Sequence, residues 1–324
     1  MIVLLIAYNK RKERILAQYA DQTEAYYCPI CQAPVILRSG CCKVPHFAHR
    51  TLSHHKHTGR RESEVHCYLK HKIYELFSKK YNDVQLEPYV YNINQIPDII
   101  VDQYVIEIQL SAISPVDIAN RTKGLTSAGY KVIWLTALPR YKCGTYYFNQ
   151  LQQTCIRPEQ HGLYSVDIHT GKLFYLSNII AITPRQFVAE KHELSYYQLL
   201  THYDSTQYTN NMIRKISVTR ILQYIAQCRR KNTVHDEVLS IMYRLQLSDI
   251  QVTRITGFIF PEQLYVSTHP VLWQLKLLEA IYYQRSVYDV LSKCMKFRHF
   301  AINDKPHPEI INRLSECYRK ILKI

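Results

Sequence analysis

The chain has 324 residues, 47% of them hydrophobic, which is enough for two domains and a small module with buried cores. Lys and Arg number 41 against 26 Asp and Glu, and the net charge of +15 favours a polyanionic partner such as nucleic acid. The sequence contains no P-loop, dinucleotide fingerprint or nucleophile elbow, so ATP hydrolysis and covalent acyl chemistry have no support.

The charge is unevenly distributed along the chain. Residues 1–60 and 141–324 carry net charges of +6 and +9, whereas residues 61–140 are neutral. A neutral centre is expected if its acids hold a metal, while the basic flanks would neutralise phosphates. The alternative is that the flanks bind nothing, as in many basic soluble proteins.

The N-terminal apolar run, residues 2–8, is predicted to form a strand, because it is too short for a secretory signal or a membrane span. Ten cysteines without an export signal favour reduced thiols that bind metal over disulfides. The protein is therefore expected in the cytoplasm.

A small module is predicted at residues 26–50. It contains four potential zinc ligands with the spacing Cys-x₂-Cys, fourteen residues, then His-x₂-His: Cys28, Cys31, His46 and His49. This is close to tetrahedral zinc-site spacing, with one residue fewer than usual between the histidines. A module this short can scarcely bury a hydrophobic core without a metal ion or a disulfide to stabilise it. This favours a zinc site over the alternative, in which the cysteines are structural thiols and the histidine segment only closes a turn. A thiol of Cys41 or Cys42 could replace one histidine, which leaves His46 less firmly assigned than the cysteine pair.

A helix is predicted from Ser63 to about Phe77, with apolar residues at helical spacing as its buried stripe. Glu64, next to that stripe, is either a third metal ligand or a solvated acid favoured by the helix dipole. His66 is a neighbouring candidate for contact with phosphate or water, although a histidine in this position is more often a surface residue.

Two acids lie in the apolar stretch 95–110, which is predicted to form a two-stranded hairpin. An unpaired carboxylate buried there would lose several kcal/mol of hydration free energy. The period of two places Glu107 and Gln109 on one face of the second strand, and antiparallel pairing would bring Asp98 opposite Glu107. A divalent ion, Mg²⁺ or Mn²⁺, held by Asp98 and Glu107 would stabilise this arrangement.

A second helix is predicted over residues 114–129, followed by an apolar central strand at 131–138. Asp117 and Arg121 are four residues apart and are predicted to pair on the exposed face of this helix. The predicted core therefore has the order helix, three strands, helix, strand, an α/β (α+β) fold.

An acid after Pro, followed by an acid-x-polar triplet near the end of the next strand, resembles the PD-(D/E)xK nuclease superfamily, whose core has this order of elements. Together with Cys28–Cys31 and the segments 45–49 and 7–10, these residues resemble the competence protein CoiA family. The resemblance implies a restriction-endonuclease-like core with four candidate catalytic residues: Asp98, Glu107, Gln109 and Glu64. It also implies processing of incoming, single-stranded DNA during transformation, with a RecA-type recombinase and other competence proteins as partners.

The chain departs from the wider superfamily at Gln109, where the pattern usually carries Lys. Gln cannot hold a positive charge beside the attacking water or the leaving phosphate, although the CoiA family tends to carry Gln there. Lys70 in the first helix or Lys131 on the next strand could supply the charge. Two alternatives therefore stay open: a DNA-binding recombination accessory that has lost hydrolysis, and an RNA endonuclease, because metal-acid sites do not distinguish the sugars.

Residues 141–180 are predicted to form short strands and turns, and the rest of the chain is predicted to be mostly helical. One helix ends in the basic run Arg229, Arg230 and Lys231, which could bind a nucleic-acid backbone or merely suit a helix C-terminus. The predicted domains are a strand and zinc-finger-like module at 1–58, a nuclease-like core at 59–140 and a mainly helical domain at 141–324.

Overall fold

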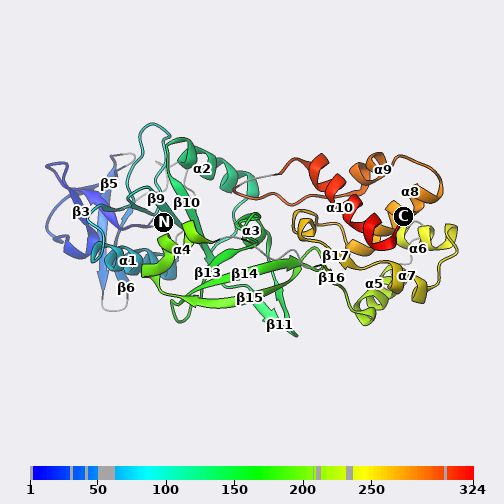
Figure 1. The fold of residues 1–324 in the computed structure, drawn as a ribbon. Helices are drawn as coiled ribbons and strands as arrows, with labels where there is room; N and C mark the ends of the chain where they lie inside the picture. Colours follow the sequence, from blue (N-terminus) through cyan, green and yellow to red (C-terminus); the bar gives the residue numbers. More distant parts are fainter. Residues whose placement is uncertain are drawn as a thin grey trace. The chain divides into compact units, whose positions relative to one another are not determined.

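Figure 1 shows the fold of the chain in a computed structural model. The chain divides into two compact units that are not contiguous in sequence. The structure describes residues 3–29, 32–40, 43–49, 63–206, 208, 213–230, 236–302 and 305–324. Unit 1 comprises Met1–Leu138, Tyr164–Phe174 and Glu193–Ser205, and unit 2 comprises Pro139–Leu163, Tyr175–His192 and Thr206–Ile324.

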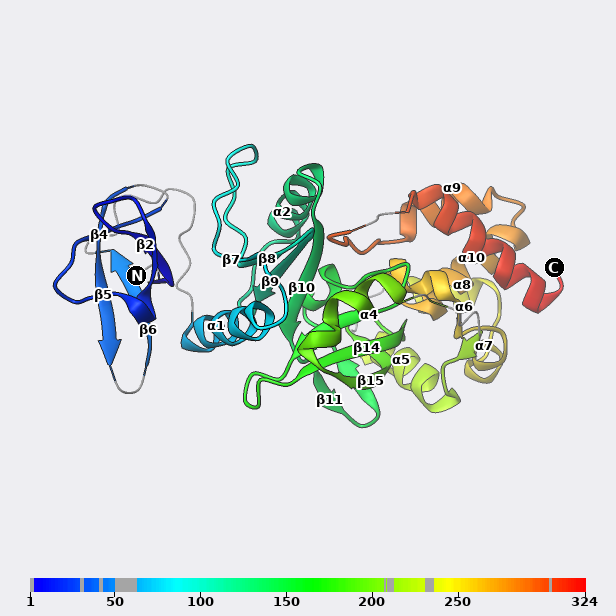
Figure 2. The same ribbon diagram turned by 60° about the vertical axis from the view of Figure 1, so that its left-hand side comes forward.

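Unit 1 begins with a six-stranded sheet, called here the N-terminal sheet (Figure 2). Its strands, in spatial order, are β1 (Val3–Leu4), β6 (Lys43–His49), β5 (Pro34–Gly40), β4 (Tyr26–Tyr27), β2 (Ile6–Tyr8) and β3 (Arg14–Leu16). The predicted strand 2–8 is interrupted at Leu5, whose N–H donates to the carboxylate of Glu87 instead of to a neighbouring strand. Buried Tyr26 and Phe47 pack with ring centroids 4.8 Å apart, which gives the sheet a small core.

The next segment of unit 1 has the predicted order of helix, three strands, helix and strand. Its elements are α1 (Glu64–Ser78), β7 (Val84–Leu86), β8 (Ile99–Val101), β9 (Tyr104–Gln109), α2 (Pro115–Ser127) and β10 (Lys131–Ala137). Strands β7, β8 and β9 are antiparallel neighbours, and β10 runs parallel to β9. Both helices have serine N-caps, since Ser63 accepts from the His66 N–H and Ser114 from the Asp117 N–H.

The core of this segment lies between the helices and the sheet. Helix α1 contacts β7, β8 and β9, and α2 contacts β10 (Figure 2). Every residue of β8 is buried, as are the first five of β9, which fits strands covered on both faces. Strand β7 is shorter than the predicted 84–90, because Glu87 takes a φ of 48° and Pro88 has no N–H to donate.

Two later segments belong to the same unit. Strand β13 (Leu163–Val166) pairs in parallel with β10, through Thr136 with Ser165 and Ala137 with Val166. Helix α4 (Leu199–Ser205) is held by Asp204, which accepts from the Tyr104 hydroxyl and lies 2.9 Å from the Lys131 ammonium. Unit 1 is therefore completed by residues that lie far beyond position 140 in the sequence.

Unit 2 combines strands with a helical C-terminal region. Its elements include β11 (Arg140–Lys142), β12 (Thr145–Tyr147), α3 (Gln150–Thr154), β14 (Leu173–Ala181), β15 (Gln186–Leu194), β16 (Arg214–Lys215), α5 (Val218–Arg230), α6 (Glu237–Arg244), α7 (Asp249–Ile255), β17 (Phe258–Ile259), α8 (Pro270–Tyr282), α9 (Val287–Cys294) and α10 (His307–Leu322). The predicted helical C-terminus is confirmed, but β14 and β15 are nine-residue strands, longer than the short strands expected and reaching beyond residue 180. The first two residues of β14 and the last two of β15 are assigned to unit 1.

None of the helices in the described ranges has the length and apolar character that crossing a membrane requires.

Candidate functional site

Asp98 and Glu107 are neighbours on two antiparallel strands. Because Ile99 pairs with Ile106, continuing the register places Asp98 opposite Glu107, as the hairpin prediction requires. Their exposed fractions are only 7% and 3%. The Oδ2 atom of Asp98 also accepts the backbone N–H of Ile108 at 2.7 Å, which fixes the carboxylate against β9. Two acids thus share a buried position at the end of the hairpin.

Two side chains of α1 bring positive charge or a donor to Asp98. Lys70 is 1% exposed and its Nζ atom lies 3.5 Å from Asp98 Oδ1, while His66 Nε2 lies 3.2 Å from Asp98 Oδ2. Burial by itself would raise the pKa of Asp98, but Lys70 and His66 outweigh it and hold that pKa well below its usual range. Asp98 is therefore ionised at neutral pH.

Glu107 has a different environment. Arg121 Nη2 donates to both carboxylate oxygens of Glu107 at 2.9 Å and to the Ile96 carbonyl at 2.9 Å. Burial nevertheless raises the pKa of Glu107 to about 7, with Arg121 opposing the shift and the charge of Asp98 adding to it. The predicted exposed pairing of Arg121 with Asp117 missed this contact, because helix spacing does not say which strand residue faces the helix.

A third buried acid, Glu87, was not among the predicted site residues. It is 6% exposed, and its Oε1 atom accepts from Lys70 Nζ at 2.5 Å. Lys70 therefore lies between the carboxylates of Glu87 and Asp98. The available sequence signal was an acid directly before Pro88 at the end of an apolar strand, a position where burial of a charge requires a partner.

The other predicted catalytic residues are placed as follows. Gln109 Nε2 donates to the carbonyl and the hydroxyl of Ser111, at 2.8 and 3.0 Å. Lys131 pairs with Tyr104 at the opposite end of β9 from Gln109, so it lies away from Asp98. Glu64 begins α1, but its side chain is outside the described residues. Of the two lysines considered for the missing charge, the structure brings Lys70 to the site.

The predicted zinc ligands are only partly described. Cys28 is fully buried, and His49 is 6% exposed on the same face as Val35 and Tyr26, with which its strand is in register. His46 pairs with Arg38 and, three residues from His49 along β6, faces the other side of the sheet. Cys31, Cys41 and Cys42 lie outside the described residues. Within the described ranges, no three His, Cys, Asp or Glu side chains form a group able to hold a metal ion.

The predicted nucleic-acid-binding run lies in the last turn of α5. Arg229 donates through both terminal nitrogens to the two carboxylate oxygens of Asp249, at 2.7 and 2.5 Å, so its charge is already paired. Arg230 is exposed and donates to the Ala226 carbonyl at 3.4 Å, while Lys231 lies outside the described residues. These contacts suit a helix C-terminus, and phosphate binding by this run stays a prediction.

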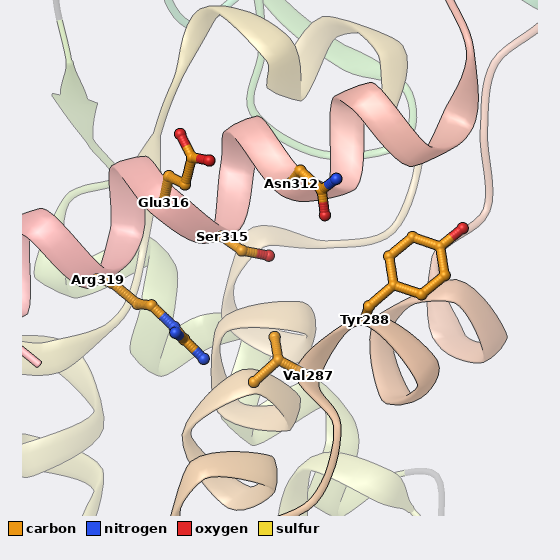
Figure 3. Close-up of a pocket in the computed structure, with 6 residues that line it drawn as sticks. All are labelled: Val287, Tyr288, Asn312, Ser315, Glu316 and Arg319. Carbon is orange, nitrogen blue, oxygen red and sulfur yellow. The ribbon is translucent and has the colours of Figure 1, made fainter.

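Figure 3 shows a pocket elsewhere in the protein, between α9 and α10 of unit 2. It has a volume of about 190 Å³ and is lined by Val287, Tyr288, Asn312, Ser315, Glu316 and Arg319. None of these residues belongs to the cluster of charged side chains around Asp98 that is described above. The pocket therefore does not mark the site described above.

Two family models match the chain. The model described as "Competence protein CoiA, N-terminal domain" matches residues 8–57, and "Competence protein CoiA, nuclease-like domain" matches residues 62–211. Together they cover more than half of the chain. The nuclease-like match includes every residue of the Asp98 cluster and extends through β13 and α4, the later segments of unit 1.

A curated relative, Competence protein CoiA of Bacillus subtilis (strain 168), is 29% identical over 130 residues. The match spans 39% of this chain and 35% of the relative, so the chain covers about a third of that protein's length. No solved structure matches the chain.

Proposed function

The chain belongs to the competence protein CoiA family, and from this premise we propose that it is a metal-dependent, nuclease-like protein that processes DNA. Its substrate would be incoming DNA, in single-stranded form, during natural transformation and homologous recombination. We further propose that it works in the cytoplasm, as the cysteines without an export signal favour, and that its partners are a RecA-type recombinase and other competence proteins, as the family resemblance implies. The phosphodiester bond would be hydrolysed at the cluster around Asp98.

The observation that carries the proposal is the position of Lys70. Its ammonium group is buried and lies 3.5 Å from Asp98, although it comes from a different element from the acid-x-polar triplet. Gln109 cannot hold the positive charge that the wider nuclease superfamily usually places at that position. We propose that Lys70 would supply such a charge from α1, beside the carboxylate that would hold the ion.

The donor set around Asp98 fits a magnesium or manganese ion. Mg²⁺ is usually bound by one or two carboxylates together with water and substrate phosphate, and Asp98 and Glu107 are two carboxylates in register. Arg121, whose side chain is 35% exposed, would have to release Glu107 before that carboxylate could bind an ion. When bound, the ion would polarise the phosphate and lower the pKa of an attacking water. Gln109 would orient that water.

Structural Zn²⁺ in the N-terminal sheet is a second proposed cofactor. Cys28 packs in the same small core as Val35, which lies directly opposite His49, and Cys31 follows Cys28 in the Cys-x₂-Cys pair. Because His46 faces the other side of β6, the fourth ligand would more readily come from Cys41 or Cys42. Zinc would then stabilise a sheet whose apolar core is small.

A second candidate function, a DNA-binding recombination accessory without hydrolysis, is favoured by a different observation. Arg121 already donates to both oxygens of Glu107, and Gln109 is bonded to Ser111. In this case the buried acids would be structural, balanced by Lys70 and Arg121. Asp98 and Glu107 would then be dispensable for DNA binding.

The two functions are separated by cleavage of labelled DNA. We expect the wild-type protein to cleave single-stranded DNA with Mg²⁺ or Mn²⁺, and the Glu107→Gln protein to bind the same DNA without cleaving it. The substitution keeps the side-chain volume, and a folded state is verified by circular dichroism. Binding without cleavage by the wild type on single-stranded DNA, double-stranded DNA and RNA would favour the accessory function. Cleavage of RNA alone would favour an RNA endonuclease.

The titration of Glu107 predicts how metal affinity depends on pH. With a pKa of about 7, Glu107 must lose its proton before it can bind the ion, whereas Asp98 is already ionised. Lowering the pH from about 7.5 to about 6 should therefore weaken Mn²⁺ binding about eightfold in isothermal titration calorimetry. The Glu107→Gln protein should lose this pH dependence, and an equally steep dependence in that variant would contradict the assignment.

The same pKa has a consequence for stability without metal. The pKa of Glu107 in the folded protein is raised above the ordinary value of 4.5. Its contribution to the free energy of unfolding is therefore fully present below about pH 4.5 and is lost as the pH rises through about 7. Adding the ion above pH 7 should restore stability, because metal binding favours the folded state.

A further inference from the structure

Glu87 has an unusual backbone conformation for its residue type. Its φ is 48°, in the left-handed region that favours glycine, and it precedes Pro88, which further restricts its backbone. A non-glycine residue persists in such a conformation only where its surroundings hold it there. Hydrogen bonds from several neighbouring residues hold Glu87 in this conformation.

Among the contacts described, four hydrogen bonds hold Glu87, and two of them come from the N-terminal sheet. Its N–H donates to the Asp98 carbonyl at 2.9 Å, and its Oε1 accepts from Lys70. From the N-terminal sheet, the Leu5 N–H donates to Oε2 at 3.0 Å, and Arg14 Nη2 donates to the Glu87 carbonyl at 3.1 Å. Arg14 Nη2 also donates to the Leu86 carbonyl at 2.7 Å. Hydrogen bonds from Arg14 therefore fix the backbone carbonyls of both Leu86 and Glu87.

These contacts form a continuous path from the N-terminal sheet to the candidate metal site. The path runs from Leu5 and Arg14 to Glu87, then through Lys70 to Asp98. Lys70 is buried and its ammonium group is fixed between two carboxylates, so its place depends on where Glu87 is held. A shift of Glu87 would move the ammonium away from Asp98 or leave one acid unbalanced.

We propose that Glu87 is a positioning residue through which the N-terminal sheet holds Lys70 against Asp98, so that the metal site is complete only while that sheet is docked. The inference rests on the proposed function for the identity of the ion. It assigns the N-terminal sheet a role in the site itself, beyond contact with nucleic acid. Glu87 also contributes a negative charge across the Lys70 ammonium from Asp98.

The test is a titration of Mn²⁺ into the full-length protein by isothermal titration calorimetry. Glu87→Gln should weaken Mn²⁺ binding roughly 10- to 100-fold, the range for groups that support metal ligands. Arg14→Gln, which changes an exposed side chain and should fold, is expected to change Mn²⁺ affinity at least about threefold, because displacing Glu87 alters how closely the Lys70 charge is held to Asp98. Two matched controls, Glu75→Gln on exposed α1 surface and Arg11→Gln in the same N-terminal segment, should bind as the wild type does.

Wild-type affinity in both Glu87→Gln and Arg14→Gln would overturn the inference. If the wild type binds no Mn²⁺, the proposed metal chemistry fails. The positioning role of Glu87 is then tested by a stability measurement that needs no metal. Arg14→Gln and Lys70→Met are then combined in a double-mutant cycle of urea unfolding. Their effects should be non-additive, because Glu87 joins the two side chains in the contacts described. Additive effects, as expected for Arg11→Gln with Lys70→Met, would contradict the proposal.

Discussion

Replacing Asp98 by asparagine should lower the rate of metal-dependent DNA cleavage about a thousandfold or more. Asparagine keeps an oxygen that can accept the Ile108 N–H, but it removes the negative charge that would bind the ion. A catalytic metal contributes several kcal/mol of transition-state stabilisation, and each ~1.4 kcal/mol corresponds to a factor of ten in rate. Single-turnover cleavage of end-labelled single-stranded DNA measures the effect.

The same substitution should preserve the fold and DNA binding, although it lowers the free energy of unfolding, because Lys70 and His66 hold the pKa of Asp98 below its usual range. Lys70 keeps its bond to Glu87 in the Asp98→Asn protein, so its charge is not left alone in the core. A matched control is Asp83→Asn, since Asp83 is an exposed acid just before β7 and its carboxylate accepts from the nearby Gln85 side chain. Cleavage by Asp98→Asn at the rate of this control would remove Asp98 from the catalytic site.

Replacing Lys70 by methionine should destabilise unit 1 by about 3–5 kcal/mol. Methionine fills a similar volume but leaves Glu87 without its ammonium partner and Asp98 with His66 as its remaining side-chain donor in the contacts described. Removing one member of a buried ion pair leaves an uncompensated charge in a low-dielectric site, and this cost exceeds the lost attraction itself. Urea unfolding followed by circular dichroism measures the change in the free energy of unfolding.

Two comparisons show whether the loss comes from buried charge. Lys79→Met changes the exposed C-cap residue of the same helix and should alter stability by no more than about 0.5 kcal/mol. Combining Lys70→Met with Glu87→Gln should cost less than the two single changes added together, because the unpaired charge is removed as well. Equal costs for Lys70→Met and Lys79→Met would mean that Lys70 balances no buried acid.

The sequence allowed prediction of the core because its elements are local. Alternating β-branched runs, serine caps and the turn between β8 and β9 each act over a few residues, so the order of elements and the facing of Asp98 and Glu107 could be predicted. The family prediction, which depended on the same residues, is confirmed. The predicted zinc and magnesium sites stay predictions.

The rest depended on contacts between residues distant in sequence. Arg121 lies 14 residues from Glu107, and Glu87 lies 17 from Lys70 and 82 from Leu5. No spacing rule within a helix or strand indicates which of several nearby cations meets a buried acid. The long strands β14 and β15 were missed for a related reason, since pairing between strands stabilises them more than their own propensity does.

The return of the chain to unit 1 after residue 163 affects how the protein can fold during synthesis. Strand β10 pairs with β9 on one side, but its other neighbour, β13, emerges from the ribosome some 30 residues later, and α4 later still. Until then a newly made N-terminal portion would present an unpaired, apolar strand edge, the kind of surface that promotes aggregation. A nascent chain halted near residue 140 would therefore be a natural client for a chaperone, and unit 1 reaches its complete set of elements only once Ser205 has been added.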